Sequence, residues 1–509
     1  MEDTSAVHFG ELTRTHDEIR RRAESLATAY AARGLGYGDR VAIVMRNDIA
    51  FIEATLAAGP LGAIPVPVNW HWRGEELAHL IRDSKSKIVV AHTDFVDEIE
   101  KVLPAGVEII EAAVPDEIVR AYALEPLAPT GRHPLMDRLI EENPPTAATY
   151  GGSPMGVVYT SGTTGLPKGV LRQPIPPEHA QLLATAVMEM YAADRSMSTL
   201  VCAPMYHSAP NLHALFAVGL DMDLTILARF DAEELLETVQ SRRIEHLQLV
   251  PTMFVRMLNL DRATRESYDV SSLRSIVHAA APCPVAVKRA ILDWFGPIVS
   301  EYYGGSETGA AVLCNSEEWQ ANPGTVGRPY LDADVKIFSP GGEELSAGET
   351  GDVYLKPFTG WPDFSYIGND AKRRDMERDG YLTVGDVGHV NEGGFLFLSD
   401  RRNDMIISGG VNIYPAEIEG VLTEMPGVAD SAVFGIPNLE FGESVAAHVQ
   451  LHPGARVTGD EIADYLGSRL ARYKVPRLIV LDEDLPRDES GKLFKRKLKA
   501  QYWKETAIV

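Results

Sequence analysis

The chain has 509 residues, of which 45% are hydrophobic, so it can bury a large core, and its length alone predicts about three or four globular units. Its 48 lysine and arginine residues are outnumbered by 72 aspartate and glutamate residues, which gives a formal net charge of −24 at pH 7. This charge excludes a general electrostatic attraction to nucleic acid or to an anionic membrane surface, so any polyanion must be bound by a local site.

The three cysteines and the first residues of the chain indicate a cellular compartment. Cys202, Cys283 and Cys314 have neither disulfide nor metal-site spacing, and we expect each to pack as a small apolar residue in a reducing environment. The acidic start, Met1-Glu-Asp-Thr-Ser5, is unlike a basic targeting peptide, and no apolar run approaches the roughly 18 residues that cross a bilayer. We therefore expect a cytoplasmic protein without a transmembrane segment, and the sequence leaves a homodimer open.

Helix and strand patterns alternate along the first part of the chain. Helical spacing from Asp17 to Arg33 is followed by a glycine-rich turn and an apolar strand over 41–45. The unit recurs with helices near 50–59 and 74–83 and with strands near 63–68 and 88–91, and similar alternation continues over 182–250. We therefore predict an α/β fold with a large N-terminal domain of layered, mostly parallel sheets covered by helices.

The next segment combines hydroxyls, glycines and one cation. An apolar strand over 155–159 leads into a loop whose N–H and O–H groups can surround phosphate oxygens, and the loop consists of Thr160, Ser161, Gly162, Thr163, Thr164 and Gly165. Lys168 adds a positive charge. The segment is not an ordinary P-loop, because Lys168 is followed by Gly169 and not by serine or threonine. We interpret it as a binding loop for the polyphosphate of ATP.

This run, Tyr159-Thr-Ser-Gly-Thr-Thr-Gly-Leu-Pro-Lys-Gly-Val170, resembles the phosphate loop of the adenylate-forming superfamily, which includes acyl-CoA synthetases, firefly luciferase and the adenylation domains of peptide synthetases. The resemblance extends from about Leu12 to Leu498 and is closest to bacterial fatty-acid or bulky-acid CoA ligases. It implies an N-terminal adenylate-forming domain over 1–402 and a small mobile α+β domain over 403–509 that carries the catalytic lysine.

Two later segments resemble the family's acyl and adenine sites. Pro204-Met-Tyr-His207 corresponds to the segment whose histidine or aromatic residue lines the acyl site, which implies a catalytic role for His207. His278-Ala-Ala-Ala-Pro282 resembles the strand end whose small residues leave a slot for adenine, formed here by Ala280, Ala281 and Pro282. Ala279 stands where the family usually has glycine.

Tyr302-Tyr-Gly-Gly-Ser-Glu-Thr308 resembles the family's Tyr-Gly-x-Thr-Glu motif, with Ser306 in place of threonine. By this resemblance Ser306 contacts the α-phosphate and Tyr303 lies beside the adenine. Glu307 then helps to hold Mg²⁺, a hard cation that prefers carboxylate oxygens near phosphate.

Beyond about Pro323 the pattern changes to short alternating strands separated by glycine turns, which predicts a small β-barrel-like subdomain over about 323–402. Within it, Asp379-Gly-Tyr-Leu-Thr-Val-Gly-Asp386 resembles the family motif whose aspartate grips both ribose hydroxyls. Asp386 has the two acceptor oxygens that this role needs.

The remaining motifs resemble the family's hinge and C-terminal domain. In Asp400-Arg-Arg-Asn-Asp404, Arg401 would reach the ribose, and Asn403 occupies the hinge position, where aspartate or lysine is usual. Asparagine tolerates the unusual backbone angles of a pivot but carries no charge. By resemblance Gly409, Gly410 and Lys474 flank the CoA path, and the segment 486–498 resembles the Gly-Lys loop, which makes Lys492 the catalytic lysine.

The resemblance implies two half-reactions. The substrate carboxylate attacks the α-phosphorus of MgATP and forms an acyl adenylate and pyrophosphate while Lys492 bridges both anions. The small domain then rotates about Asn403, so that the CoA thiol can attack the acyl carbon. The expected partners are a small carboxylic acid, ATP and CoA, with Mg²⁺ as cofactor.

The presumed acid pocket consists mostly of small residues, namely His207, Ser208, Ala209, His278, Ala279, Gly304, Gly305, Ala310 and Ala311. They predict a roomy, mostly apolar cavity for a fatty, aryl or steroid-type acid. An α-amino acid is not expected, because no carboxylate near His207 can pair with its ammonium group.

Other functions remain open at this point. CoA is favoured as acceptor because no carrier domain follows the Lys492 loop, but ligation onto a separate carrier protein is the nearest alternative and luciferase-like oxidation is a weaker one. A noncatalytic nucleotide sensor is a further alternative. The joint presence of Lys492, Glu307 and Asp386 argues against it.

Overall fold

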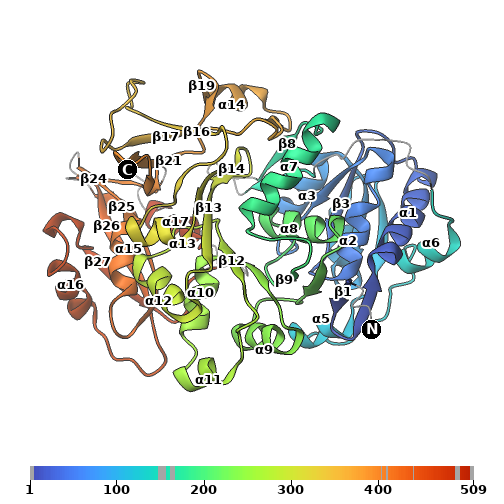
Figure 1. Cartoon of the computed structure of the whole chain (residues 1–509), viewed down its shortest axis with the longest axis horizontal. Helices are drawn as coiled ribbons and strands as arrows, with labels where there is room; N and C mark the ends of the chain where they lie inside the picture. Colours follow the sequence, from blue (N-terminus) through green and yellow to red (C-terminus); the bar gives the residue numbers. More distant parts are fainter. Residues whose placement is uncertain are drawn as a thin grey trace.

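The computed structural model describes residues 5–146, 156–160, 167–402, 404–408, 411–438, 441–487 and 493–504. It is a mixed α/β structure in which the N-terminal layers lie at one end and the C-terminal segments at the other (Figure 1). Among the described residues, no helix combines the length and the apolar character needed to cross a membrane.

The first layer is a four-stranded parallel sheet in the order β4 (Ile64–Pro67), β3 (Arg40–Val44), β5 (Ser86–His92) and β6 (Glu108–Ala112). Its helices are α1 (His16–Ala32), α2 (Ile49–Leu56), α3 (Gly74–Ser84), α4 (Val96–Glu100), α5 (Asp116–Ala121) and α6 (Met136–Glu142), with short 3₁₀ turns at Gly59–Leu61 and Thr93–Phe95. Successive strand residues supply different cores, since Val41 packs with Leu26 of α1 whereas Ala42 packs with Leu77 of α3. The helices and strands predicted here are confirmed to within a few residues.

The second layer is a nine-stranded sheet. Its order is β15 (Arg328–Pro329), β14 (Gly309–Cys314), β13 (Val299–Gly305), β12 (Ser275–His278), β11 (His246–Leu249), β9 (Ser198–Val201), β10 (Asp223–Ile226), β1 (Ala6–Phe9) and β2 (Leu12–Thr15). Adjacent strands are parallel from β13 through to β1, whereas β14, β15 and β2 pair antiparallel with their neighbours. The sequence patterns did not predict the β1–β2 hairpin, because each strand has only four residues and β2 is mostly exposed.

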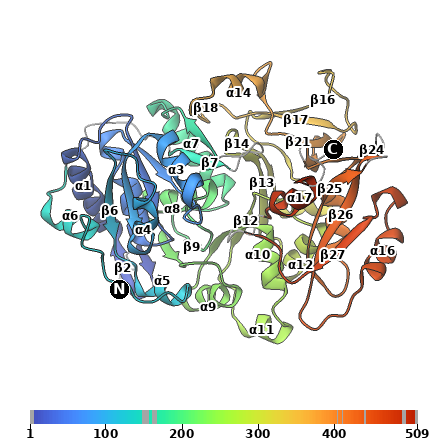
Figure 2. The ribbon, with the colours of Figure 1, turned by 180° about the vertical axis from the view of Figure 1, so that it is seen from behind.

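Helices cover both faces of this sheet, as the views from the two sides show (Figure 2). They are α7 (Pro177–Met190), α8 (Ser208–Gly219), α9 (Ala232–Arg242), α10 (Pro251–Leu258), α11 (Arg262–Ser267), α12 (Val285–Phe295) and α13 (Ser316–Ala321). Leu247, Ile276 and Val299 face a core shared with α10 and α12. Tyr302 lies in a different core, which it shares with Tyr191 at the end of α7.

Two smaller sheets complete the N-terminal part. One has the order β18 (Phe364–Tyr366), β8 (Lys168–Arg172) and β7 (Val158–Thr160), and its strands are antiparallel. The other contains β19 (Glu377–Arg378), β20 (Tyr381–Leu382), β17 (Gly351–Lys356), β21 (Asp386–Val390), β22 (Leu396–Arg401) and β16 (Asp334–Phe338), and α14 (Asp370–Asp375) precedes β19. The six-stranded sheet is the predicted β-rich subdomain.

The C-terminal segment forms a separate five-stranded sheet of β24 (Val411–Ile413), β23 (Ile406–Ser408), β26 (Gly442–Leu451), β25 (Val428–Asn438) and β27 (Leu478–Asp482). Its helices are α15 (Pro415–Thr423), α16 (Gly459–Gly467) and α17 (Lys495–Lys504), with a 3₁₀ turn at Arg472–Lys474, and α17 lies beside β25 (Figure 2). Sheet membership therefore changes between β22 and β23, and the domain boundary expected at 402/403 stays a prediction. The predicted pivot, Asn403, lies outside the described residues.

Candidate active site

The turn that joins β13 to β14 carries Ser306 and Glu307. At Gly304 an added Cβ would lie 1.6 Å from the backbone oxygen of Gly309, so only glycine fits this close strand approach. The Thr308 hydroxyl accepts a hydrogen bond of 2.9 Å from the Gly305 amide and closes the turn. These contacts present Ser306 and Glu307 at the end of the central sheet.

Glu307 receives a hydrogen bond from the three-stranded sheet. The Tyr366 hydroxyl on β18 donates to Glu307 Oε1 at 2.7 Å. Burial and the Glu307 charge raise the pKa of Tyr366, so this hydroxyl stays protonated and continues to donate. One carboxylate oxygen is thus fixed, and the orientation of the carboxylate is defined before any ligand binds.

Arg172 at the end of β8 holds the same turn from another side. Its Nη2 and Nε donate to the Ser306 carbonyl at 2.7 and 3.2 Å, and its guanidinium lies 5.3 Å from the centre of the Trp361 ring. Burial lowers the pKa of Arg172 to about 10, which leaves it charged at neutral pH. The sequence analysis missed Arg172, although its spacing of four residues from Lys168 on a strand places both on one face.

Two lysines add charge beside Glu307. Lys372 of α14 places Nζ 4.2 Å from the centre of the Tyr366 ring, and burial together with neighbouring Lys168 lowers the pKa of Lys372 to about 8. Lys168, Lys372 and Arg172 therefore form a cluster of cations around a single carboxylate. Such a donor set fits a polyphosphate, while Glu307 supplies the oxygen ligand that Mg²⁺ prefers.

The predicted phosphate loop leaves β7 at Thr160 and enters β8 at Lys168, and the register pairs these two residues. The ends of the loop are thus held opposite each other, close to the residues that surround Glu307. Ser161, Gly162, Thr163, Thr164 and Gly165 lie outside the described residues, and their contacts with phosphate stay a prediction.

The two residues expected at adenine and ribose meet across the fold. The Tyr303 hydroxyl donates to Asp386 Oδ2 at 2.7 Å, although 83 positions separate the two residues. Asp386 begins β21, and the strand register places it opposite Arg401 of β22. Two residues from different motifs therefore meet, and the backbone of Arg401 lies opposite one of them, while their roles at adenine and ribose stay a prediction.

The strand end expected to hold adenine has an unusual backbone. Ala280 has a φ of +72°, in the left-handed region that alanine rarely adopts. Ala280, Ala281 and Pro282 are exposed, whereas Ala279 before them is buried. The chain thus leaves the sheet sharply after β12 and presents small side chains at its end.

Several of the predicted acid-site residues lie near the Ser306 turn. Ser208 Oγ is 3.4 Å from Ser306 Oγ, His207 immediately precedes α8, and the Ala209 carbonyl accepts a hydrogen bond of 3.1 Å from the Tyr191 hydroxyl. Gly304 and Gly305 are half-buried, while Ala310 and Ala311 are buried on β14. The first turn of α8 therefore faces the nucleotide motifs directly.

His278 is placed differently from the prediction, which had its side chain in the acid pocket. The side chain is fully buried on one face of the sheet, and Tyr302 lies on the other face. The Nε2 of His278 is 3.4 Å from Glu301 Oε2, and its ring is 5.3 Å from that of Phe254. Lys288 of α12 approaches the same Glu301 oxygen to 2.5 Å. Burial drives the pKa of His278 well below its usual value, so it is a neutral core residue.

The predicted residues of the C-terminal domain are mostly not tested by the geometry. Lys492, Gly409, Gly410 and Asn403 lie outside the described residues, and of Arg401 only the backbone is described. Lys474 pairs with the Glu417 carboxylate at 2.5 Å. The Asp400 carboxylate accepts a hydrogen bond of 2.9 Å from the Ala416 amide and so connects β22 to α15.

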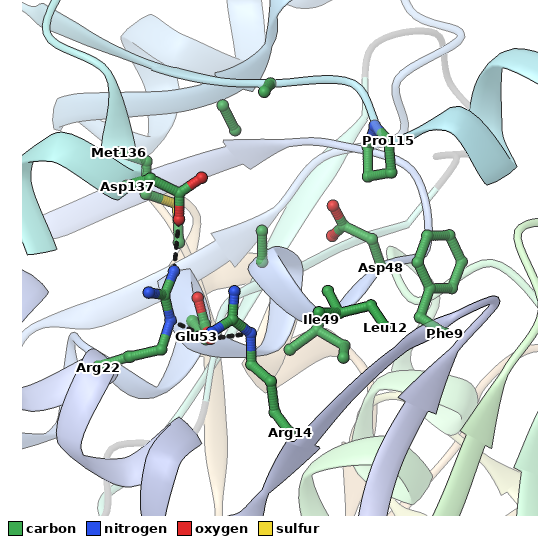
Figure 3. Close-up of a pocket in the computed structure, with 13 residues that line it drawn as sticks. Phe9, Leu12, Arg14, Arg22, Asp48, Ile49, Glu53, Pro115, Met136 and Asp137 are labelled. Atoms are coloured by element: carbon green, nitrogen blue, oxygen red, sulfur yellow. Dashed lines mark hydrogen bonds and ion pairs between the residues drawn. The ribbon is translucent and has the colours of Figure 1, made fainter.

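A cavity of about 120 Å³ beside α2 contains none of the predicted site residues (Figure 3). In it Glu53 is buried and accepts a hydrogen bond of 2.7 Å from Arg22, which also pairs with Asp137, while Arg14 lies 3.4 Å from Glu53. Carboxylates there compensate the arginine charges. This arrangement supports the packing of α1 on α2 and supplies no reactive group.

Comparison with known proteins agrees with this geometry. A family model described as "AMP-binding enzyme" matches residues 1–357, and one described as "AMP-binding enzyme C-terminal domain" matches residues 417–492. A feruloyl-CoA synthase from Amycolatopsis sp. is 32% identical over 98% of this chain and 96% of its own length. The long-chain-fatty-acid–CoA ligase FadD13 of Mycobacterium tuberculosis is 30% identical over 96% of this chain and 93% of its own.

Among solved structures, ATP-bound MatB from Rhodopseudomonas palustris superposes with a TM-score of 0.84 at 26% identity. The match covers 99% of this chain and 97% of that one. The similarity therefore includes both the large N-terminal layers and the small C-terminal sheet.

Proposed function

The chain belongs to the AMP-binding enzyme family, and from this premise we propose that it is an AMP-forming acid–thiol ligase that joins a carboxylic acid to coenzyme A. One observation carries the proposal: Ser306 and Glu307 lie between a cluster of cations on one side and the first turn of α8 on the other. A polyphosphate and an acid carboxylate would meet at this turn.

In the first half-reaction, Arg172 holds the turn while Lys168 and Lys372 neutralise phosphate charge. Glu307 would hold Mg²⁺, which would supply further neutralisation on the phosphate oxygens. Ser306 lies where it can donate to the α-phosphate as the acid carboxylate attacks the phosphorus and pyrophosphate leaves. Positioning and charge neutralisation account for the catalysis.

Asp386 and Tyr303 hold the nucleoside in this proposal. The 2.7 Å hydrogen bond between them fixes the aspartate, whose remaining oxygen capacity is available for ribose hydroxyls. The backbone register brings Arg401 to the same place. The nucleoside is thereby anchored while the chemistry takes place at its phosphate.

We further propose that Lys492 completes the adenylation site and that the C-terminal domain then turns about Asn403. Gly409 and Gly410 would border the path of the CoA thiol in the second half-reaction. The support for these roles is the family resemblance of the motifs. The change of sheet between β22 and β23 is consistent with a pivot at this point.

For the acid, we propose a hydrophobic compound of fatty, aryl or steroid type. Ala209, Gly304 and Gly305 are small and half-buried beside Ser306, which favours an apolar acid over a compact polar one. The names of the two relatives, one a feruloyl-CoA synthase and one a long-chain-fatty-acid–CoA ligase, point to aryl and to fatty acids respectively.

The test is pyrophosphate release from ATP in the presence of fatty, cinnamic, benzoic and steroid acids, followed by mass spectrometry for the CoA thioester. We expect release to depend on the acid and a thioester to appear only when CoA is added. An adenylate that transfers to a carrier protein but not to CoA would favour the carrier-loading alternative. Absence of acid-dependent pyrophosphate release with every acid would refute the ligase.

A Lys492→Ala variant separates the half-reactions. We expect adenylate formation to fall about a thousandfold while thioester formation from a preformed adenylate falls less than tenfold. Lys497→Ala, which removes an exposed lysine of α17, is the matched control. Equal losses in the two half-reactions would remove Lys492 from the adenylation site.

A further inference from the structure

The face of the central sheet that lies behind Ser306 contains a group of buried polar side chains that the proposed chemistry does not use. They are Tyr191, Thr199, His213, His246, Gln248 and Tyr302. Thr199 Oγ1 is 2.8 Å from both His213 Nε2 and His246 Nδ1, so these three side chains are joined by hydrogen bonds. Burial lowers the pKa of His246 to about 4, and the group is therefore uncharged.

Two members of the group have a buried polar atom without a hydrogen-bond partner among the described residues, His246 at Nε2 and Gln248 at its amide oxygen, and Gln248 is the one that contacts Tyr302. Its side chain is 4% exposed, and its Nε2 donates to the Tyr302 hydroxyl at 3.4 Å. Its carbonyl oxygen Oε1 is buried and has no hydrogen-bond partner among the residues that the structure describes. A buried amide oxygen without a donor costs free energy that a bound ligand can recover.

The direction of the hydrogen bonds decides which amide atom is left over. The Ala209 carbonyl can only accept, so the Tyr191 hydroxyl must donate to it. The Tyr302 ring lies edge-on to the Tyr191 ring, with centroids 6.0 Å apart, and the Tyr302 hydroxyl accepts from the Gln248 amide N–H at 3.4 Å. The amide is thereby oriented, and the group without a partner is the acceptor oxygen.

This series of contacts leads from Gln248 to the reaction centre. It passes through Tyr302 and Tyr191 to the carbonyl of Ala209, the residue after Ser208, whose hydroxyl faces Ser306 at 3.4 Å. Tyr302 precedes Ser306 by four residues on β13, a span of about 13 Å along a strand. Tyr302, Gly304 and Gly305 are half-buried, so this strand is partly exposed between Tyr302 and the Ser306 turn.

From this geometry we infer that the enzyme selects an acid that carries a hydrogen-bond donor, such as a hydroxyl group, at the end remote from its carboxylate, and that Gln248 Oε1 accepts from it. The inference rests on the proposed ligase function and narrows its substrate class. A fatty or aryl acid without a donor group leaves the Gln248 amide oxygen without a hydrogen bond. A site with an unpaired buried polar group binds such an acid less well than one that supplies the donor.

The experiment compares acids of similar size that differ in the donor. The pairs are para-hydroxycinnamate against cinnamate, para-hydroxybenzoate against benzoate, and ω-hydroxydodecanoate against dodecanoate, with para-methoxycinnamate as an acid that keeps the oxygen but loses the proton. We expect kcat/KM to be about ten- to a hundredfold higher for the donor in at least one pair, and the methyl ether to fall with the unsubstituted acid.

Gln248→Met keeps the side-chain length and removes the amide, so the preference for the acid with the donor should fall to less than about threefold. Tyr302→Phe removes the hydroxyl that orients the amide and should weaken the preference in part. It also provides a second measurement if Gln248→Met folds poorly. Gln181→Met, an exposed glutamine of α7, is the control and should retain the full preference.

The outcomes separate the two proposals. Thioesters that form with no preference for the donor, or a preference that survives in Gln248→Met, would overturn this inference and leave the ligase intact. If no acid in the panel supports pyrophosphate release, the ligase function fails, and the substrate inference fails with it.

Discussion

The two faces of the sheet at β11, β12 and β13 use buried polar residues in different ways. On one face, which we call the closed face, Glu301 pairs with Lys288, which has no solvent exposure, and the neutral His278 lies 3.4 Å from the same carboxylate. On the other face, Gln248 and Tyr302 form an uncharged group that continues to the half-buried turn at Ser306. The closed face has charges that compensate each other. On the second face, which we call the open face, the acceptor Gln248 Oε1 has no donor among the described residues. The charges of the closed face therefore stabilise the core, whereas the open face is the one that we propose contacts a ligand.

The largest expected effect tests the closed face. Lys288→Met should lower the free energy of unfolding by about 3–5 kcal/mol, because it leaves Glu301 buried without a partner. Urea unfolding is a suitable measurement, and Trp319, whose ring centre lies 5.3 Å from Lys288 Nζ, provides a fluorescence probe. Gln248→Met on the open face should cost no more than about 1 kcal/mol.

The double variant Lys288→Met/Glu301→Gln is the control for this pair. It removes both charges and should recover most of the lost stability. A double variant as unstable as the single one would contradict the view that the cluster is a compensated ion pair.

The next effect concerns the Ser306 turn, at the end of the open face. Arg172→Met should lower kcat/KM for ATP about a hundredfold, which corresponds to about 2.7 kcal/mol, because the Ser306 carbonyl loses both donors. Steady-state kinetics at saturating acid measure it. Arg374→Met, an exposed arginine of α14, should leave the kinetics unchanged. A loss below threefold in Arg172→Met would show that the turn holds its shape without this arginine.

Lowering the pH should reduce the free energy of unfolding through both faces, because each contains a histidine kept neutral by burial. The pKa of His246 falls from 6.5 to about 4 in the folded protein, so its contribution to stability is present above pH 6.5 and is lost as the pH falls toward 4. Between pH 6.5 and 5 this loss amounts to about 2 kcal/mol. His246→Asn should reduce the pH dependence of the unfolding free energy by that amount.

His278→Asn gives the corresponding measurement on the closed face, since burial also drives the pKa of His278 well below its usual value. A similar reduction is expected between pH 6.5 and 5. If neither substitution changes the acid dependence, the two histidines are not held neutral in the folded state.

The smallest effect is expected at the nucleoside. Tyr303→Phe removes the hydrogen bond to Asp386 and should raise KM for ATP about fivefold, equivalent to about 1 kcal/mol. Tyr381→Phe breaks a comparable tyrosine–aspartate hydrogen bond, to Asp334 in the six-stranded sheet, and should not change KM. Equal KM values in the two variants would separate Tyr303 from ATP binding.

The site residues that the sequence could propose are those with a local signature. Ser306 and Glu307 follow a strand and two glycines, and Lys168 follows a loop of glycines and hydroxyls, so their chemistry is readable from neighbouring residues. His278 also lies in such a motif. The face of the sheet on which its side chain lies depends on its position in the alternation along β12, and the motif does not predict that position. Arg172, Lys372, Tyr366 and Gln248 had no motif around them and were missed.

By itself the sequence determined the α/β alternation and the order of the nucleotide motifs, and it predicted the kind of anion they bind, because these depend on periodicity and on functional groups that lie close together along the chain. Only the tertiary structure decided which side chains meet. Tyr303 donates to Asp386, and Tyr366 donates to Glu307. Lys288 pairs with Glu301 on the face where His278 is buried. Those contacts join residues from separate strands and helices. Their geometry follows from sheet register and helix packing, which no local stretch of sequence specifies.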